Sequence, residues 1–250
     1  MQRAEYLEHF DQQTDAFVAA AAGKLDHPVP TCPGWTVADL AEHVWGVINF
    51  WPHVVLHNVQ DPNEIPPLRP DPTSGDLMAA IRRDTDQAIG LLRHVNWKAP
   101  LWNWSKNRTV SFVHRRLPNE ISIHRWDAEN AVGTPNEIPP DLAQDGVDEF
   151  IDIFIGSGWT TFKKGKPFAG EQIKIHQVDP NRDWTIRLDK RTASVSGDAA
   201  TPDLTVRGRA NDLVLMFWRR TGTERIEVRA RETGAHGLVA AADVVADAGR

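Results

Sequence analysis

A carboxylate and an imidazole stand four residues apart in this chain, as Glu120 and His124, among apolar neighbours. On a helix, residues at this spacing lie on one face, one turn apart, so both side chains can bind a single ion. A second imidazole, His43, lies in another apolar segment and would have to come from a neighbouring helix. Two histidines and one carboxylate leave one coordination position open for water or substrate. The residue types and their spacing therefore predict a metal site of an enzyme.

Simpler explanations exist for each of these residues. A lone histidine on an apolar face is commonly a hydrogen-bonded core residue, and Glu120 would be solvated if its helix were rotated. A buried carboxylate without a partner is costly, however, which favours a bound cation. His53 and His57 share the four-residue spacing, but they precede a proline-rich loop and are expected to be solvated. Asp127 returns to nearly the same helical face as Glu120, where it either orients a metal ligand or pairs with a surface cation such as Arg125.

Helices are expected over most of the first 157 residues, because apolar residues recur there at spacings of three and four. The expected segments are residues 4–22, 36–54, 75–95, 118–132 and 140–155. Thr36, with Asp39 three residues later, has the pattern of a helix N-cap. His43 lies beside the apolar stripe of the second segment, between Leu40 and Val47, and is expected to point into the protein.

The start of the fourth helix is open between two alternatives. Pro118 can occupy the first turn of a helix without losing a needed hydrogen bond. The helix can equally begin near Ser111 and pass through the proline with a kink. Both alternatives place Glu120 and His124 inside a helix.

After residue 156 the pattern changes to short segments in which apolar and polar residues alternate, as in half-buried strands. The expected strands are residues 173–176, 184–188, 193–195, 204–206 and 226–228, while residues 210–220 and the alanine-rich tail are expected to be helical. The predicted organisation is thus α+β, with a helical bundle over residues 1–160 and a small α+β domain over residues 168–250.

The composition excludes several classes of protein. With 250 residues, 41% of them hydrophobic, the chain can bury a sizeable core. Its formal charge of -6 and the lack of a long Lys/Arg run argue against nucleic acid as a partner. No stretch approaches the roughly 18 apolar residues of a membrane span, and no hydrophobic signal core follows the N-terminus. We therefore expect a cytoplasmic protein that does not bind membranes. The sequence gives no indication of its oligomeric state.

The single cysteine, Cys32, cannot form an intrachain disulfide, which agrees with a reducing compartment. We expect it to be a small buried residue rather than a nucleophile, because no basic neighbour in the sequence would lower its pKa.

Three blocks of the sequence resemble the mycothiol-dependent maleylpyruvate isomerase family of actinobacteria. They are residues 31–43 (TCPGWTVADLAEH), Glu120 to His124 with Asp127, and residues 213–220 (LVLMFWRR). The blocks occur in order, and the likeness covers nearly the whole chain. It implies a DinB-like, up-and-down four-helix bundle that holds a divalent metal, usually zinc, followed by a small α/β domain that covers the site. By position, the resemblance implies that His43, Glu120 and His124 are the metal ligands, and the spacing indicates the same three residues.

The resemblance also implies a functional arginine at Arg220, where the family tends to have a Gly-Arg pair. Here Arg219 stands in place of the glycine. In the isomerases that the chain resembles, the thiol of mycothiol adds to an activated double bond, rotation follows and the thiol leaves, while an arginine holds a substrate oxygen. Residues 182–231 contain eleven Lys/Arg and seven Asp/Glu, which suits an anionic substrate unless these charges simply cover the outward faces of strands.

Three hypotheses about function follow. The first is a zinc-dependent, mycothiol-using isomerase or thiol transferase, in which a metal-bound thiolate attacks a small electrophilic, anionic substrate. In the second, the same three ligands bind non-haem Fe(II) and activate oxygen. The third is a non-enzymatic regulatory protein that keeps the bundle and a structural metal. We favour the first; metal content distinguishes it from the second, and thiol dependence distinguishes it from the third.

Overall fold

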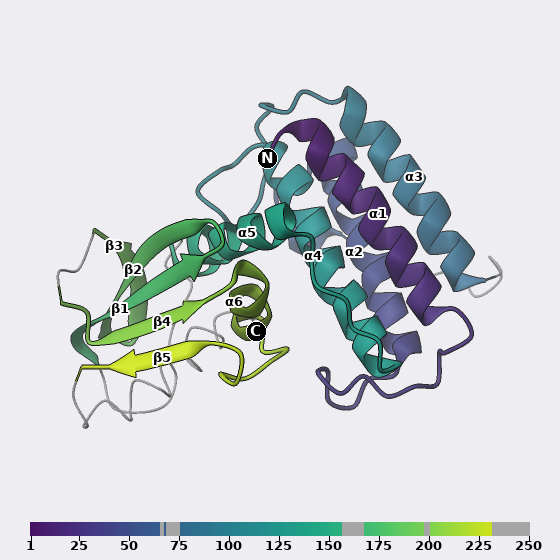
Figure 1. The fold of residues 1–250 in the computed structure, drawn as a ribbon. Helices are drawn as coiled ribbons and strands as arrows, with labels where there is room; N and C mark the ends of the chain where they lie inside the picture. The colour runs from purple at the N-terminus through teal and green to yellow at the C-terminus, as the bar shows by residue number, and fades with distance from the viewer. Residues whose placement is uncertain (66–67, 69–75, 157–167, 198–200, 232–250) are drawn as a thin grey trace. The chain divides into compact units, whose positions relative to one another are not determined.

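The computed structural model describes residues 1–65, 68, 76–156, 168–197 and 201–231, and shows a chain of mixed helix and sheet (Figure 1). It divides into two compact units, Met1–Ile138 and Pro139–Arg250. The expected combination of helices and a sheet is confirmed. The division falls earlier than the domain boundary expected near residue 160, because the helix that begins at Pro140 packs against a helix of the second unit.

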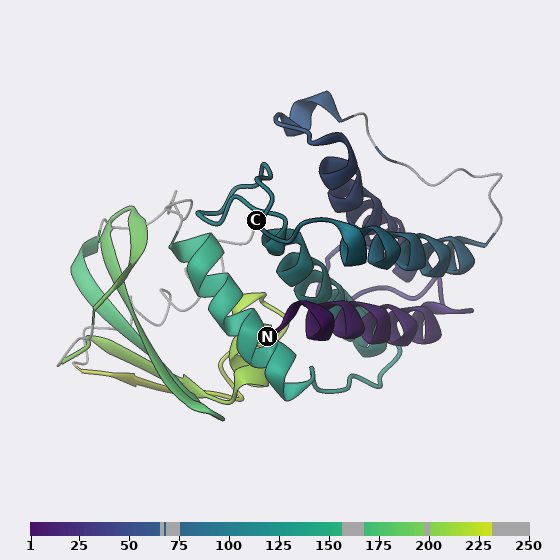
Figure 2. The ribbon, with the colours of Figure 1, turned by 90° about the horizontal axis from the view of Figure 1, so that it is seen from above.

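Four long helices make up most of the first unit. They are α1 (Arg3–Ala21), α2 (Val37–His57), α3 (Leu77–His94) and α4 (Ser111–Ala131), with a short 3-10 helix, η1 (Pro62–Glu64), after α2. Both α1 and α2 pack against α3 and α4, and Figure 2 shows α1, in purple, alongside α3. The fully buried side chains between the helices include Phe10, Phe17, Leu40, Ile81, Leu117 and Ile121. Burial of each such side chain contributes about 1.5–3 kcal/mol to stability.

The start of α2 is fixed by the cap that the sequence predicts. The Thr36 hydroxyl accepts a hydrogen bond from the Asp39 backbone N–H, and the Asp39 carboxylate accepts one from the Thr36 N–H at 2.7 Å. The hydrogen bonds that the Thr36 N–H and hydroxyl donate to the Asp39 carboxylate lower the pKa of Asp39. On the apolar stripe Val47 is only half-buried, and the neighbouring Ile48 is buried instead. The cap sets the rotation of α2 less than two turns before His43.

The fourth helix begins at Ser111 and contains Pro118, which is the second of the two alternatives that the sequence left open. A proline has no N–H, so the His114 carbonyl loses the hydrogen bond that it would accept within a regular helix. Nearly every side chain between Phe112 and Glu129 is buried, because α4 contacts both α1 and α2. This packing compensates for the unfavourable proline, and the helix continues without interruption to Glu120 and His124.

His114 is a buried histidine of α4 that makes the stability of the protein depend on pH. Its Nδ1 lies 3.1 Å from the Val110 carbonyl oxygen and its Nε2 lies 3.1 Å from that of Leu92. Burial is the largest influence on this ring and lowers the pKa of His114, outweighing the two carbonyls that favour the charged ring. The unfolded chain therefore binds a proton more readily than the folded one.

We expect the free energy of unfolding to fall as the pH drops below about 6.5, the ordinary pKa of histidine, by up to about 1.4 kcal/mol per pH unit from His114. Chemical denaturation at pH 8 and at pH 5.5 measures this change. The His114→Gln variant should show a smaller loss between the two pH values, since glutamine does not titrate. Equal losses in the two proteins would contradict the assignment to His114.

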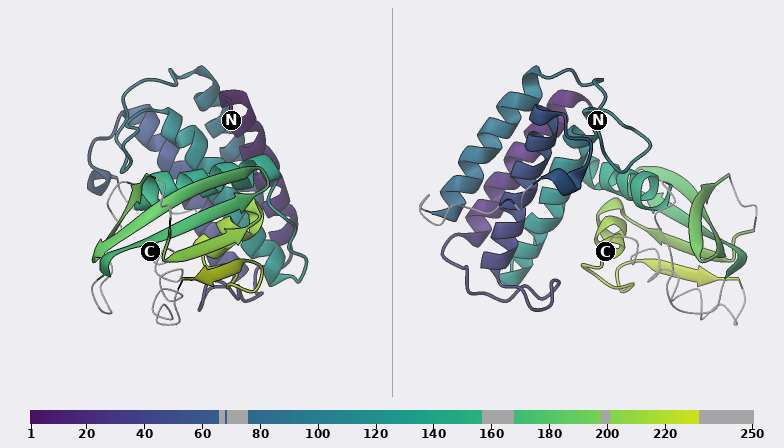
Figure 3. Two further views of the ribbon diagram at one scale, coloured as in Figure 1. Left: turned by 60° about the vertical axis from the view of Figure 1, so that its left-hand side comes forward. Right: turned by 180° about the vertical axis from the view of Figure 1, so that it is seen from behind.

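The second unit combines a five-stranded sheet with α5 (Pro140–Glu149), which continues into the π-helix η2 (Phe150–Ile155), and α6 (Ala210–Phe217). The strands are β1 (Phe168–Val178), β2 (Asn181–Lys190), β3 (Thr192–Ser196), β4 (Leu204–Gly208) and β5 (Glu227–Ala230). Their order is β3-β2-β1-β4-β5, and β1 and β4 are parallel, as the left view of Figure 3 shows face-on. All five predicted strands are thus found. The helix predicted for the alanine-rich tail lies outside the described residues.

Apolar residues on one face of the sheet pack against α6, and α6 in turn packs against α5. The rings of Phe150, the first residue of η2, and Phe217 of α6 stack with their centroids 4.9 Å apart. The predicted helix over residues 210–220 ends earlier, at Phe217, in a turn of unusual backbone conformation. Among the described residues of the chain, no helix is both long enough and apolar enough to cross a bilayer.

The turn after α6 is a Schellman motif. The N–H of Arg219 donates to the Met216 carbonyl at 2.9 Å, and the N–H of Arg220 donates to the Leu215 carbonyl at 2.8 Å. This motif requires a left-handed residue, which is Arg219 with φ of 57°. The position is therefore one that favours glycine, the residue that the family the sequence resembles tends to have there.

We expect the Arg219→Gly variant to be more stable than Arg219→Ala by about 1 kcal/mol, because only the side chain with a Cβ is strained at this φ. The alanine variant removes the same contacts of the arginine side chain, so the comparison isolates the backbone. Midpoints of denaturant unfolding measure the difference. An alanine variant as stable as the glycine variant would show that the turn is not strained.

Candidate metal site

Three side chains of types that can bind a metal ion meet in the first unit, between α2 and α4. His43 comes from α2, while Glu120 and His124 come from successive turns of α4. Each of the three residues offers one ligand atom, and these atoms all lie within 4.8 Å of one another. The Oε1 atom of Glu120 lies 3.3 Å from His124 Nε2 and 3.6 Å from His43 Nε2. Their role as metal ligands stays a prediction, but their side chains lie close enough to share one ion.

The donor set fits a divalent cation. Ligand atoms about 2.1 Å from a tetrahedral zinc ion lie about 3.4 Å from one another, and the two Glu120–histidine separations bracket this value. The imidazole rings of His43 and His124 meet edge to face, with centroids 4.8 Å apart and planes at 81°. Imidazole nitrogen and carboxylate oxygen are both ligands that zinc takes in proteins.

The site is closed on one side and open on the other. The side chain of His124 is 9% exposed and that of Glu120 is 18% exposed, whereas the side chain of His43 is 37% exposed. The half-exposed ring of Trp35 lies next to His43, at 5.4 Å between centroids. A small molecule can therefore reach the site from the side of His43 while His124 stays buried.

Asp127 is fully buried and anchors the buried histidine. One of its carboxylate oxygens lies 3.1 Å from His124 Nδ1, and the other accepts a 2.6 Å hydrogen bond from the Thr31 hydroxyl. The alternative partner considered for Asp127, Arg125, instead pairs with Glu129 at 2.6 Å. A carboxylate on Nδ1 fixes the ring so that Nε2 points at Glu120, which is the usual support of a metal-bound histidine.

Cys32 also lies beside Asp127, with Sγ 3.9 Å from a carboxylate oxygen. It is only partly buried, so the expectation of a buried cysteine is wrong. The reason is that residues 28–36 form a loop ahead of α2, closed by an isolated bridge between Pro28 and Thr36. The loop joins the site through Thr31 and Cys32, which both contact a residue 95 positions or more further along the chain.

Arg116 contributes to the site although the sequence analysis did not consider it. Its guanidinium forms an ion pair with Oε2 of Glu120, and its side chain is only 5% exposed. The signal in the sequence is the spacing, because Arg116 precedes Glu120 by four residues just as Glu120 precedes His124. Arg116, Glu120 and His124 thus lie along one face of α4 in three successive turns.

The remaining candidates come from other segments of the chain. Arg220 belongs to the second unit, where it is partly exposed and donates to the Trp218 carbonyl at 2.7 Å. His53 and His57 have ring centroids 4.4 Å apart near the end of α2, and neither belongs to the cluster of three metal-ligating residues found in the described part of the chain. We expected both histidines to be solvated; His57 is exposed, whereas His53 is half-buried.

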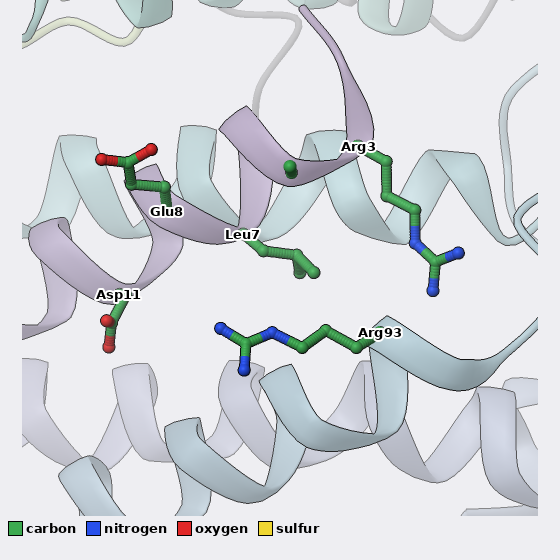
Figure 4. Close-up of a pocket in the computed structure, with 6 residues that line it drawn as sticks. Arg3, Leu7, Glu8, Asp11 and Arg93 are labelled. Carbon is green, nitrogen blue, oxygen red and sulfur yellow. The ribbon is translucent and has the colours of Figure 1, made fainter.

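A separate depression of about 580 Å³ lies against α1 and α3 (Figure 4). Its lining consists of Arg3, Ala4, Leu7, Glu8, Asp11 and Arg93. Figure 4 shows Arg93 reaching toward α1, below Leu7. The depression carries charges of both signs and contains none of the three clustered metal-ligating residues, so it does not form part of the site.

The chain is similar to one domain family and to two curated proteins. Residues 7–129, which include His43, Glu120 and His124, match the model of the mycothiol maleylpyruvate isomerase N-terminal domain. Two uncharacterized proteins of Mycobacterium tuberculosis, MT0763 and Rv0738, are each 30% identical over 174 residues, covering 63% of this chain and 82% of theirs.

The crystal structure of the mycothiol-dependent maleylpyruvate isomerase superposes with a TM-score of 0.54 at 17% identity, covering 91% of this chain and 93% of that one. A histidine-to-alanine mutant of that isomerase matches equally well. The similarity of fold thus extends over both units, beyond the residues that the family model matches. By its residues 7–129, the chain belongs to the mycothiol maleylpyruvate isomerase N-terminal domain family.

Proposed function

We propose that the protein is a metal-dependent enzyme that uses a small thiol, mycothiol, as its cosubstrate. His43, Glu120 and His124 would hold the metal ion, for which zinc is the best fit to two imidazoles and one carboxylate. The observation that supports this proposal most strongly is the convergence of these three donors from two helices. The family to which the chain belongs supplies the identity of the thiol.

When bound, the metal ion would supply a positive charge that lowers the pKa of a thiol in its open position, so that the thiolate becomes the nucleophile. The chain's own residues prepare this position. Asp127 holds the His124 ring by its Nδ1 and keeps Nε2 directed at the site. The exposure of His43 leaves room for a thiol to enter beside it.

We further propose that Arg220 binds an anionic group of the substrate. Arginine presents a planar set of donors that matches a carboxylate, and the Arg220 side chain is only partly buried. The reaction would then be an isomerisation or a thiol transfer on a small anionic electrophile. The helical unit would correspond to a DinB-like four-helix bundle, because α1, α2, α3 and α4 pack against one another in pairs.

The experiment that tests this function combines metal analysis with thiol binding. Protein purified without chelators is expected to contain zinc, and the cobalt-substituted protein is expected to develop a sulfur-to-metal absorption band when mycothiol is added. An Arg220→Lys variant is expected to keep the band and the metal while losing affinity for an anionic substrate. Iron in place of zinc, with oxygen consumption, would favour the non-haem Fe(II) alternative. Zinc without any response to thiol would favour a non-enzymatic protein.

A further inference from the structure

We propose that Arg116 reserves one oxygen of the Glu120 carboxylate and so restricts this residue to a single bond with the metal ion. The two oxygens of Glu120 face different partners. Oε1 lies 3.3 Å from His124 Nε2 and 3.6 Å from His43 Nε2, on the side of the two histidines. Oε2 forms the ion pair with the Arg116 guanidinium. This inference rests on the proposed function, since it assigns a role around the same metal.

Burial makes this pairing strong and specific. The side chain of Arg116 is 5% exposed, so its charge requires a nearby anion. Arginine remains protonated in proteins, and its rigid planar fork holds a carboxylate in a fixed orientation. Because Arg116 and Glu120 are one turn apart on α4, the helix itself keeps the two groups together. Glu120 therefore has its orientation set before any cation binds.

The consequence concerns the open coordination position. A carboxylate with both oxygens free can bind a metal ion through either one or both of them. A second bond from Glu120 would occupy a position that a catalytic site leaves open for an outside molecule. Arg116 blocks this second bond by holding Oε2. Its positive charge also favours anions close to the site, among them a thiolate.

The same helix provides a matched control. Arg125 and Glu129 form a second buried arginine–glutamate pair at the same four-residue spacing, with side chains 3% and 8% exposed. Arg125 also donates to Gln13 and to the Asn136 carbonyl, so its role is to hold α4 against neighbouring segments. Glu129 does not belong to the metal-ligating cluster. Removing the Arg125 side chain should therefore lower the stability of the protein about as much as removing that of Arg116. Only the removal of Arg116 should change how the metal ion is coordinated.

The test loads the full-length wild type, Arg116→Gln and Arg125→Gln with cobalt(II) and records the visible spectrum with and without 2-mercaptoethanol. Four-coordinate cobalt absorbs more strongly than five-coordinate cobalt. We expect strong bands for the wild type and Arg125→Gln, and weaker bands for Arg116→Gln, in which Glu120 binds through both oxygens. The affinity of the cobalt protein for the thiol should fall about tenfold in Arg116→Gln alone, the size of effect that partners of metal ligands commonly have.

If Arg116→Gln folds and has the same cobalt spectrum and the same thiol affinity as the wild type, the inference is overturned while the proposed function stays intact. If the wild type binds no cobalt, the proposed function fails and the inference fails with it. If Arg116→Gln does not fold, the crystal structure of the zinc-loaded wild type tests the inference instead. Glu120 bound through Oε1 alone, with Oε2 on Arg116, supports the inference, and a carboxylate bound through both oxygens refutes it.

Discussion

The His124→Ala variant is expected to bind zinc roughly 100-fold more weakly than the wild type, or worse, and to lose thiol-dependent activity with it. Removal of one of three protein ligands leaves too few donors to compete with water, and even partners of ligands commonly contribute 10–100-fold to affinity. His124 is the most buried of the three side chains, so water cannot easily replace its nitrogen. Competition with a chromogenic chelator measures the affinity.

His53→Ala is the matched control for this experiment. His53 is a histidine of the same unit, on the same helix as His43, but it contacts His57 rather than the site. Its loss should leave the zinc affinity unchanged, which excludes a general effect of removing an imidazole. A zinc affinity in His124→Ala equal to that of the control would show that the cluster of His43, Glu120 and His124 is not where the metal binds.

The Asp127→Asn variant is expected to bind zinc about 10- to 100-fold more weakly, although Asp127 itself is not expected to touch the ion. Asp127 accepts from Thr31 on one oxygen and faces both His124 Nδ1 and Cys32 Sγ with the other. Asparagine has the same shape but only one accepting oxygen. An NH₂ group that faces His124 would break the contact that orients its ring. An NH₂ group that faces Thr31 would leave a neutral oxygen on Nδ1 in place of a carboxylate, so both outcomes weaken His124 as a ligand.

The same chelator competition measures the effect of Asp127→Asn, and Asp84→Asn serves as its control. Asp84 is another largely buried aspartate of the first unit, which accepts hydrogen bonds from Trp45 and Asn49 away from the site. Both substitutions should lower stability, but only Asp127→Asn should lower metal affinity. Equal metal affinities in the two variants would reduce Asp127 to a structural role.

The sequence predicted what depends on local spacing. The four-residue separation of Glu120 and His124 placed them on one helical face, and the Thr36–Asp39 pair located the start of α2. Alternation of apolar and polar residues located all five strands. These features follow from helix and strand periodicity, which is a property of neighbouring residues alone.

What depends on long-range packing was harder to predict. The sequence left the start of α4 undecided because proline is unfavourable inside a helix, and the burial of this helix between α1 and α2 explains why it persists through Pro118. The contacts of Thr31 and Cys32 with Asp127 join segments that no periodicity relates. Arg116 was visible by its spacing to Glu120, yet nothing in the sequence distinguishes its pair from the equally spaced Arg125 and Glu129.

The central claim is that three side chains from two helices hold one metal ion with a position free for sulfur. Its most direct test is the metal content of the wild-type protein, measured together with the absorption of its cobalt form on addition of mycothiol. We expect about one zinc ion per chain and a sulfur-to-cobalt band that saturates with the thiol. The account would be contradicted if the folded protein turned over its substrate with no bound metal. It would also be contradicted if the spectrum of the cobalt protein did not change when the thiol was added.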